Sequence, residues 1–117
     1  MNRVAIIILN WNCADDSIAC AKSILAQTEP SDIIFADNNS SDNSVNKIEY
    51  FINKRNSMYL IKNNKNLGFA GGINSGLRQA LSKKYDYIAL LNPDATADKN
   101  WLKFLVKEMD KHNRCGI

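Results

Sequence analysis

Four short apolar runs, separated by segments of helical periodicity, constrain the fold of this chain more than any other feature. The runs are rich in β-branched residues and cover residues 4–9, 32–37, 58–62 and 86–91. Strands that are buried on both faces, as in a parallel sheet, have this composition. After each run, apolar residues recur at spacings of three and four, as on one face of an amphipathic helix. The sequence therefore predicts four strand–helix units.

Regular alternation of strands and helices indicates parallel strands that are joined by right-handed crossovers. We therefore expect an α/β fold with a doubly wound, mainly parallel sheet of about four strands flanked by helices. A length of 117 residues fits one domain, which we place at residues 1–117. Residues 114–117 have the character of the start of a further strand. We therefore expect this domain to be the front part of a larger fold.

Polar residues before three of the helical segments are the expected N-caps. Asp15 or Asp16 precedes the first segment, Ser41 or Asp42 the second, and Asp98 the fourth. Short polar side chains at this position accept a hydrogen bond from a free backbone N–H of the first turn.

The composition excludes several classes of protein. Three cysteines without a C-x-x-C spacing, beside one histidine, indicate neither a disulfide framework nor a zinc site, and they favour a reducing, cytoplasmic compartment. Residues 4–9 are too few to span a membrane. The chain lacks the interleaved basic and aromatic residues that nucleic-acid-binding modules show, so we do not expect nucleic acid as a partner.

Positive charge is concentrated between residues 47 and 65. There Lys54, Arg55 and Lys62 are opposed only by Glu49. A solvated surface is one interpretation of this excess, and attraction to anionic lipid or to a phosphate-bearing ligand is the other.

In doubly wound sheets, ligands bind beyond the carboxyl ends of the strands. Amides and carboxylates follow all four predicted strands, in residues 10–12, 37–42, 63–68 and 92–94. A carboxylate that ends an apolar strand, as Asp37 does, is costly to desolvate unless it accepts hydrogen bonds. Each such residue taken alone could form a turn or a helix cap, but together they favour a binding site.

Glycines are concentrated in residues 68–76, at the start of the third helical segment. Such a helix start can offer backbone N–H groups to an anionic ligand, or it can allow tight packing of the helix on the sheet. The spacing fits neither the dinucleotide-binding G-x-G-x-x-G pattern nor a P-loop.

Taken in order, these stretches resemble the family 2 nucleotide-sugar glycosyltransferases of the GT-A fold, in particular the rhamnosyltransferase-like branch. Residues 8–12, 36–42, 66–76 and 90–95 carry the resemblance and together span almost the whole chain. It implies the strand order 3-2-1-4 and a Rossmann-like N-terminal half of a GT-A fold that binds a nucleoside-diphosphate sugar. The residues expected at the nucleotide sugar are Asn10, Trp11, Asn12, Asp37, Asn39, Asn66, Gly68, Gly71, Gly72 and Asn74.

The resemblance also implies a site for a divalent cation, Mg²⁺ or Mn²⁺. Asn92, Pro93 and Asp94 stand at the D-x-D position of the family, where Asp94 would hold an ion that bridges the diphosphate oxygens. Asn92 replaces the first aspartate of that pattern, so we expect weak metal affinity in the absence of nucleotide.

The resemblance further implies that catalysis needs a residue outside the stretches named above. Inverting members of the family use a carboxylate base far beyond the D-x-D position, so we expect the base beyond residue 117 and no turnover by this chain alone. The implied acceptor is a glycan, a polysaccharide or a lipid-linked sugar, and the implied location is cytoplasmic, peripheral at the membrane face. We expect self-association through a free sheet edge.

Two other functions stay open. The first is a non-catalytic nucleotide-binding or interaction module. The second is a nucleotidyltransferase, although residues 10–13 lack the glycine- and basic-rich loop expected there.

Overall fold

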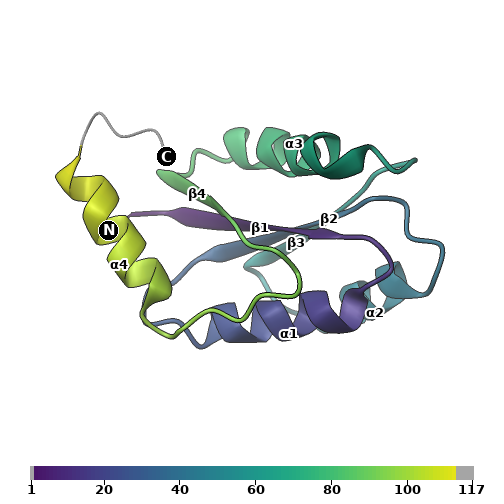
Figure 1. The fold of residues 1–117 in the computed structure, drawn as a ribbon, viewed down its shortest axis with the longest axis horizontal. Helices are drawn as coiled ribbons and strands as arrows, with labels where there is room; N and C mark the ends of the chain where they lie inside the picture. Colours follow the sequence, from purple (N-terminus) through teal and green to yellow (C-terminus); the bar gives the residue numbers. More distant parts are fainter. Residues whose placement is uncertain (1, 113–117) are drawn as a thin grey trace.

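The computed structural model describes residues 2–112, which form one four-stranded sheet covered by helices on both faces (Figure 1). The elements in chain order are β1 (Val4–Asn10), α1 (Ala14–Leu25), β2 (Asp32–Asp37), α2 (Ser44–Ile52), β3 (Met58–Lys62), α3 (Gly68–Leu81), β4 (Tyr87–Leu90) and α4 (Trp101–Lys111).

All neighbouring strands are parallel, and their order is β3-β2-β1-β4. This confirms the α/β class and the strand order 3-2-1-4. The predicted bounds of β2 and β3 are correct, whereas β1 continues one residue further, to Asn10, and β4 is shorter than predicted. Differences of one residue at strand ends are usual where pairing gives way to a loop.

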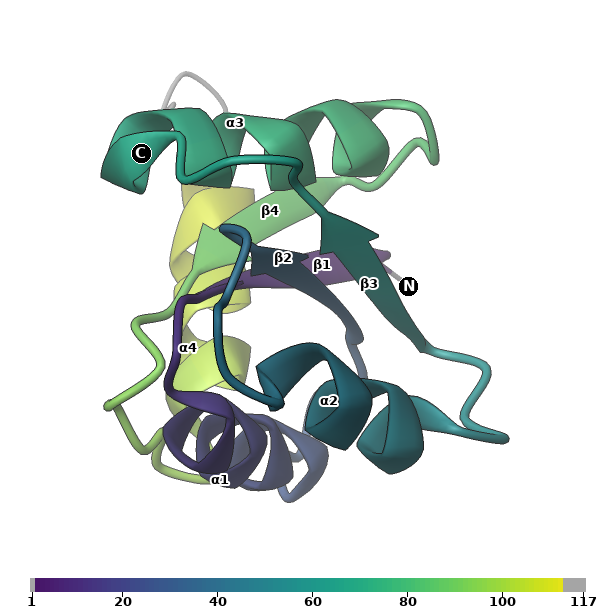
Figure 2. The same cartoon turned by 90° about the vertical axis from the view of Figure 1, so that its right-hand side faces the viewer.

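Alternate side chains of β1 enter two separate cores. Ile6 and Ile8 pack with α1, α2 and α4 on one face of the sheet. Ala5 and Ile7 pack with α3 on the other face. Figure 2 shows α1 and α2 side by side on one side of the sheet and α3 on the opposite side. Burial on both faces explains why the strands are almost continuously apolar.

The predicted N-caps are wrong. Cys13 is the N-cap of α1, and Asp15 and Asp16 lie inside its first turn, where a negative charge is favourable beside the helix dipole. The N-caps of α2 and α4 are the asparagines Asn43 and Asn100. Aspartates precede both helices in the turn that leads into them, a position that sequence spacing does not distinguish from the cap itself.

In each of those two turns the aspartate side chain still accepts a hydrogen bond from a backbone N–H. Asp42 Oδ1 accepts from Ser44 N at 2.9 Å, and Asp98 Oδ1 accepts from Asn100 N at 2.9 Å. Hydrogen bonds from Ser44 also lower the pKa of the Asp42 carboxyl.

Within residues 2–112, no helix has the length and hydrophobicity needed to cross a lipid bilayer.

Candidate functional site

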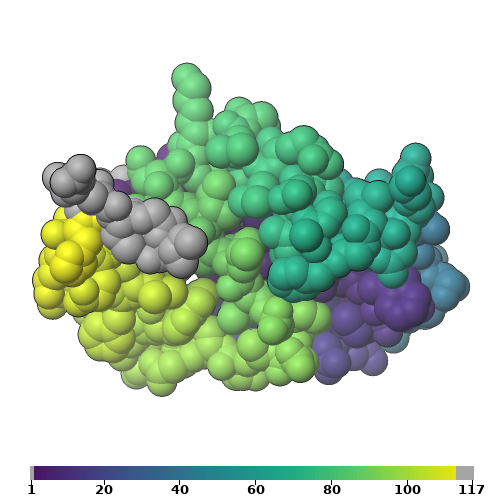
Figure 3. Space-filling model, turned by 45° about the horizontal axis from the view of Figure 1, so that its top comes forward, coloured from purple at the N-terminus to yellow at the C-terminus, as the bar shows by residue number. Residues whose placement is uncertain are grey.

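The loops that follow the four strands all lie at one edge of the sheet, because parallel strands end on the same side. We call this edge the carboxyl-end rim; it comprises residues 10–13, 37–43, 63–68 and 91–95. In Figure 3 the purple loop after β1, the teal loop before α3 and the green loop after β4 adjoin on the surface. The structure therefore brings together the segments in which the sequence predicts a site.

Asp37 is the centre of a hydrogen-bond network in this rim. Its side chain is buried, with 1% exposed. Oδ1 accepts from Asn10 Nδ2 at 2.9 Å and from the Ser40 hydroxyl at 2.6 Å, while Oδ2 accepts from Ser40 N at 3.0 Å. These bonds offset the cost of desolvating the carboxylate, since a carboxylate oxygen bonded to several donors is stable in a buried position.

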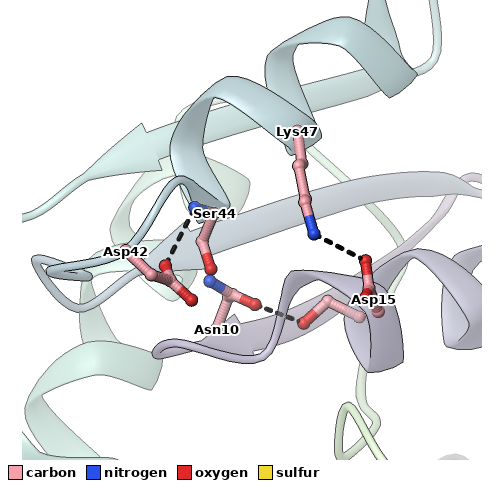
Figure 4. A network of polar contacts seen from close by, with 6 residues as sticks. Asn10, Asp15, Asp42, Ser44 and Lys47 are labelled. Carbon is pink, nitrogen blue, oxygen red and sulfur yellow. Dashed lines mark hydrogen bonds and ion pairs between the residues drawn. The ribbon is translucent and has the colours of Figure 1, made fainter.

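Asn10 extends this network from β1 to a helix. Its side chain is fully buried, and its Oδ1 accepts from the Ser17 hydroxyl of α1 at 2.6 Å. Its backbone oxygen accepts from Asn38 N at 2.9 Å. Figure 4 shows the Asn10 side chain pointing toward α1, with Asp42 bonded to Ser44 at the start of α2 nearby. Asn10 thus holds β1, β2 and α1 in one arrangement.

Asn12 joins the loops after β1 and β2. Its Oδ1 accepts from Ser41 N at 2.8 Å and from Asp42 N at 3.2 Å, and its own N–H donates to the Ser40 hydroxyl at 2.9 Å. Asn12 and Asn39 have φ values of 51° and 61°. Asparagine tolerates this left-handed region better than most side chains, which explains part of the asparagine content of the rim.

Asn38 helps to hold the rim together, although the sequence did not indicate it as a site residue. It is buried, its Nδ2 donates to Gly68 O at 3.0 Å, and its Oδ1 accepts from Asn63 Nδ2 at 3.1 Å. It therefore holds the start of α3 against the rim. Its position in the sequence could have indicated this, because Asn38 lies between Asp37 and Asn39, which are both expected at the nucleotide sugar.

The glycines of α3 serve packing at two positions. A Cβ atom at Gly72 would lie 2.5 Å from Leu9 Cδ1, and one at Gly76 would lie 2.8 Å from Ile7 Cγ2. Tight packing of the helix on the sheet, one of the two interpretations left open, therefore explains Gly72 and Gly76. Gly68 has a φ of +76° and nothing near its missing Cβ, so the turn requires the glycine there.

The residues predicted to bind nucleotide divide into two sets by exposure. Asn10, Asp37 and Gly72 are buried in the described structure. The others are partly or fully exposed: Trp11, Asn12, Asn39, Asn66, Gly68, Gly71 and Asn74. Trp11 is 51% exposed, so its ring is available to a ligand. Ligand contact by either set stays a prediction.

Residues 91–95, the part of the rim that follows β4, contain one carboxylate, that of Asp94. Asp94 and Asn92 are both exposed, and Asn92 O accepts from Cys20 Sγ at 3.5 Å. Burial raises the pKa of the Cys20 thiol to about 11, and the negative charge of Asp94 adds to this shift. Within residues 2–112, Asp94 makes no hydrogen bond or ion pair to another side chain, and it does not contact the Asp37 network.

The residues at β4 can supply only part of a metal site. Among residues 2–112, no three side chains of the His, Cys, Asp and Glu types gather to hold an ion. A free aspartate oxygen suits Mg²⁺ or Mn²⁺, provided that a bound diphosphate and water supply the other ligands. Asp94 therefore fits an ion that arrives with its nucleotide better than one held by protein alone.

The sequence matches the model of a known family. Residues 5–117 fit the family described as glycosyl transferase family 2. The chain is 35% identical over 116 residues to the UDP-Glc:alpha-D-GlcNAc-diphosphoundecaprenol beta-1,3-glucosyltransferase WfaP of Escherichia coli, covering 92% of this chain and 43% of that enzyme. It is 27% identical to the poly-beta-1,6-N-acetyl-D-glucosamine synthase of Staphylococcus aureus, covering 99% of this chain and 27% of that protein. The chain thus spans less than half the length of these relatives.

Solved structures share the fold. The mannosyltransferase PcManGT of Pyrobaculum calidifontis, in complex with GDP-Man and Mn²⁺, superposes with a TM-score of 0.83 at 20% identity, over 92% of this chain and 32% of that one. Staphylococcus aureus TarS in complex with UDP-GlcNAc superposes with a TM-score of 0.80 at 19% identity, over 95% of this chain and 32% of that one. At these identities the likeness concerns the fold.

Proposed function

Because the chain belongs to glycosyl transferase family 2, we propose that its carboxyl-end rim binds a nucleoside-diphosphate sugar for transfer to a glycan or lipid-linked acceptor. One observation carries the proposal. The four stretches that resemble the family meet at one sheet edge, where Asp37, Asn12 and Asn38 hold the loops together and leave Trp11 and Asp94 exposed.

In this proposal the buried network shapes the nucleoside site. Asp37 makes three hydrogen bonds to Asn10 and Ser40, and a carboxylate has about four acceptor positions, so one remains for a base N–H. Trp11 is exposed in the loop after β1, and Asn39 lies in the loop that Asp37 begins. The rim is held in shape by the protein before a ligand arrives, which reduces the cost of ordering it on binding.

We propose that Asp94 holds Mg²⁺ or Mn²⁺ together with the diphosphate of the donor. Such an ion, when bound, offsets the negative charge that develops on a diphosphate leaving group. The carboxylate of Asp94 is free to face it, whereas the Asn92 side chain contributes no charge. Support comes from PcManGT, which shares the fold and was solved with GDP-Man and Mn²⁺.

The chemistry of transfer is proposed by analogy with the relatives. The names of WfaP and of the poly-beta-1,6-N-acetyl-D-glucosamine synthase describe transfer to a lipid-linked sugar and synthesis of a polysaccharide. We extend this acceptor class and an inverting mechanism to the present chain. We assign the base that deprotonates the acceptor to none of residues 1–117, and we expect this chain to bind donor without turnover.

Calorimetric titration tests this proposal. UDP, dTDP and GDP are titrated into the chain with and without Mn²⁺, and we expect at least one of them to bind more tightly with the ion. Asp94→Ala should remove the dependence on Mn²⁺, while Asp37→Ala should weaken binding with or without it. Asn92→Asp should strengthen the metal effect, because it restores a second carboxylate.

Asp15→Ala is the matched control, since Asp15 is an exposed aspartate of α1 whose partner is Lys47. It should leave nucleotide binding unchanged. Absence of binding by all three nucleotides would contradict the proposal and favour a non-catalytic interaction module. Sugar transfer by the purified chain would contradict the assignment of the base.

A further inference from the structure

A basic groove lies between α1 and α2, away from the carboxyl-end rim. Its volume is about 690 Å³, and the residues that carry the argument are Lys22, Lys47, Tyr50, Phe51, Lys54 and Arg55. We call it the α1–α2 groove; Figure 2 shows its two helices side by side on the face of the sheet opposite α3. It includes part of the basic excess of residues 47–65 and adds a lysine from α1. The proposed function does not use it.

The charge of this groove has a single sign. Four of its lining residues are cations and none of them is Asp or Glu. Lys47 pairs with Asp15 at 3.1 Å, but within residues 2–112 Lys22, Lys54 and Arg55 form no ion pair. Like charges gathered without acidic partners repel one another, so an anionic partner would relieve this repulsion.

Aromatic side chains lie among these cations. Tyr50 is 85% exposed, the most exposed of the large hydrophobic side chains in the described residues. Phe51 packs on the core beneath the groove, and the Arg55 guanidinium carbon lies 4.8 Å from the centre of its ring. Arg55 Nε also donates to Phe51 O at 2.9 Å, which holds this cation in the groove wall.

We propose that the α1–α2 groove docks on the anionic surface of a lipid bilayer. Lysine and arginine have long apolar stems that can rest on lipid while their charges meet phosphate groups. Tyrosine is suited to the bilayer interface, because its ring is apolar and its hydroxyl is polar. A soluble polyanion would be attracted by the same charge but would gain little from Tyr50. The proposal rests on this surface alone and does not depend on nucleotide binding.

Vesicle flotation tests the proposal. The full chain is mixed with vesicles of phosphatidylcholine alone, or of phosphatidylcholine with phosphatidylglycerol, at low and at high salt. We expect binding only to the anionic vesicles, and weaker binding at high salt. The double variant Lys22→Gln with Lys54→Asn should lower the partition coefficient about 25-fold, from the usual contribution of a lysine at an anionic membrane. Asparagine is chosen because Lys54 has a φ of 64°.

The double variant Lys103→Gln with Lys107→Gln is the matched control. It removes the same charge from exposed positions of α4, a helix that also carries the acidic residues Glu108 and Asp110. Its partition coefficient should change by less than about threefold, whereas Tyr50→Ser should lower binding several-fold without changing net charge.

Three results would overturn the proposal. The first is failure of the unmodified chain to bind anionic vesicles. The second is an equal loss in the two double variants, which would show attraction by net charge only. The third is unchanged vesicle binding by Tyr50→Ser together with equally tight binding to heparin, which would assign the groove to soluble polyanions.

Discussion

At the scale of single residues, burial separates side chains that look alike in the sequence. Asp37 is the last residue of β2 and Asp94 lies in the loop after β4. Asp37 is 1% exposed and bonded to Asn10 and Ser40, whereas Asp94 is exposed. In the proposed site, Asp37 therefore shapes the rim and keeps one acceptor position, whereas the Asp94 carboxylate is free to hold an ion. Burial also decides the chemistry of Cys20. Its thiol lies against the backbone oxygen of Asn92, and its raised pKa makes it a poor nucleophile.

Cys20 leads to a prediction about pH. Its pKa rises from 9.0 to about 11 in the folded chain, so the unfolded chain loses this proton first. The stability that the thiol contributes is present below pH 9 and is lost as pH rises through about 11. The free energy of unfolding should therefore fall over this window by an amount on the order of 2 kcal/mol from Cys20.

Urea unfolding of the parent chain and of Cys20→Ala, each at pH 9 and at about pH 11, measures this effect. The variant is expected to be less stable at pH 9 but to lose less stability on going to the higher pH. Tyr85 and Tyr87 also have raised pKa values, but both proteins contain them, so they cancel in the comparison. Equal losses in the two proteins would contradict the prediction.

At the scale of elements, α3 is placed by close approach to the sheet. Gly72 faces Leu9 and Asn38, and Gly76 faces Ile7, with no room for a side chain at either position. Asn38 then bonds to Gly68 O at the start of the helix. The same contacts that pack the helix also set the position of the loop that the proposed donor would meet.

Gly72→Ala tests this placement. At an exposed position inside a helix, replacing glycine by alanine raises the free energy of unfolding by about 1 kcal/mol. At Gly72 the new Cβ would lie 2.5 Å from Leu9 Cδ1 and 2.7 Å from Asn38 Nδ2, so the helix must shift. We expect a loss of about 1–3 kcal/mol in the free energy of unfolding, measured by urea denaturation.

Asn74→Ala is the control, because Asn74 is exposed on the same helix two residues away. It should be neutral or slightly stabilising, since alanine is the better helix former. A stable Gly72→Ala variant would show that α3 can move without cost and that the glycine has another purpose.

At the scale of the whole molecule, the sheet has two free edges in the described residues. β4 pairs only with β1, and β3 pairs only with β2. Leu90, the last residue of β4, is 48% exposed. Unpaired strand edges with apolar side chains favour pairing with another chain.

We expect this edge to cause self-association. Light scattering after size exclusion should give a mass that rises above the 13.2 kDa of one chain as concentration increases. Leu90→Lys should reduce the rise, since a lysine at a strand edge opposes pairing. Phe104→Lys on exposed α4 is the control for added charge and lost hydrophobicity. A single mass at every concentration would rule out association.

The strands, the order of elements and the α/β class could be predicted from the sequence, because hydrophobic pattern acts over a few residues and strand–helix alternation allows few topologies. The strand order was implied by the resemblance to a family and is confirmed. The starts of α2 and α4 were misplaced by one or two residues, because Asp42 and Asp98 bond in the preceding turn as readily as a cap would.

Which polar residues of the carboxyl-end rim are buried, and which face solvent, was decided only by the tertiary structure. Asn10 and Asp37 are 27 residues apart, and Asn38 and Asn63 are 25 apart, so no local pattern shows that they meet. The same holds for the α1–α2 groove, where Lys22 of α1 joins cations that follow it by 25 residues or more in the chain. Hydrogen bonds and charge depend on distances in space, which exist only after the sheet and its helices have packed.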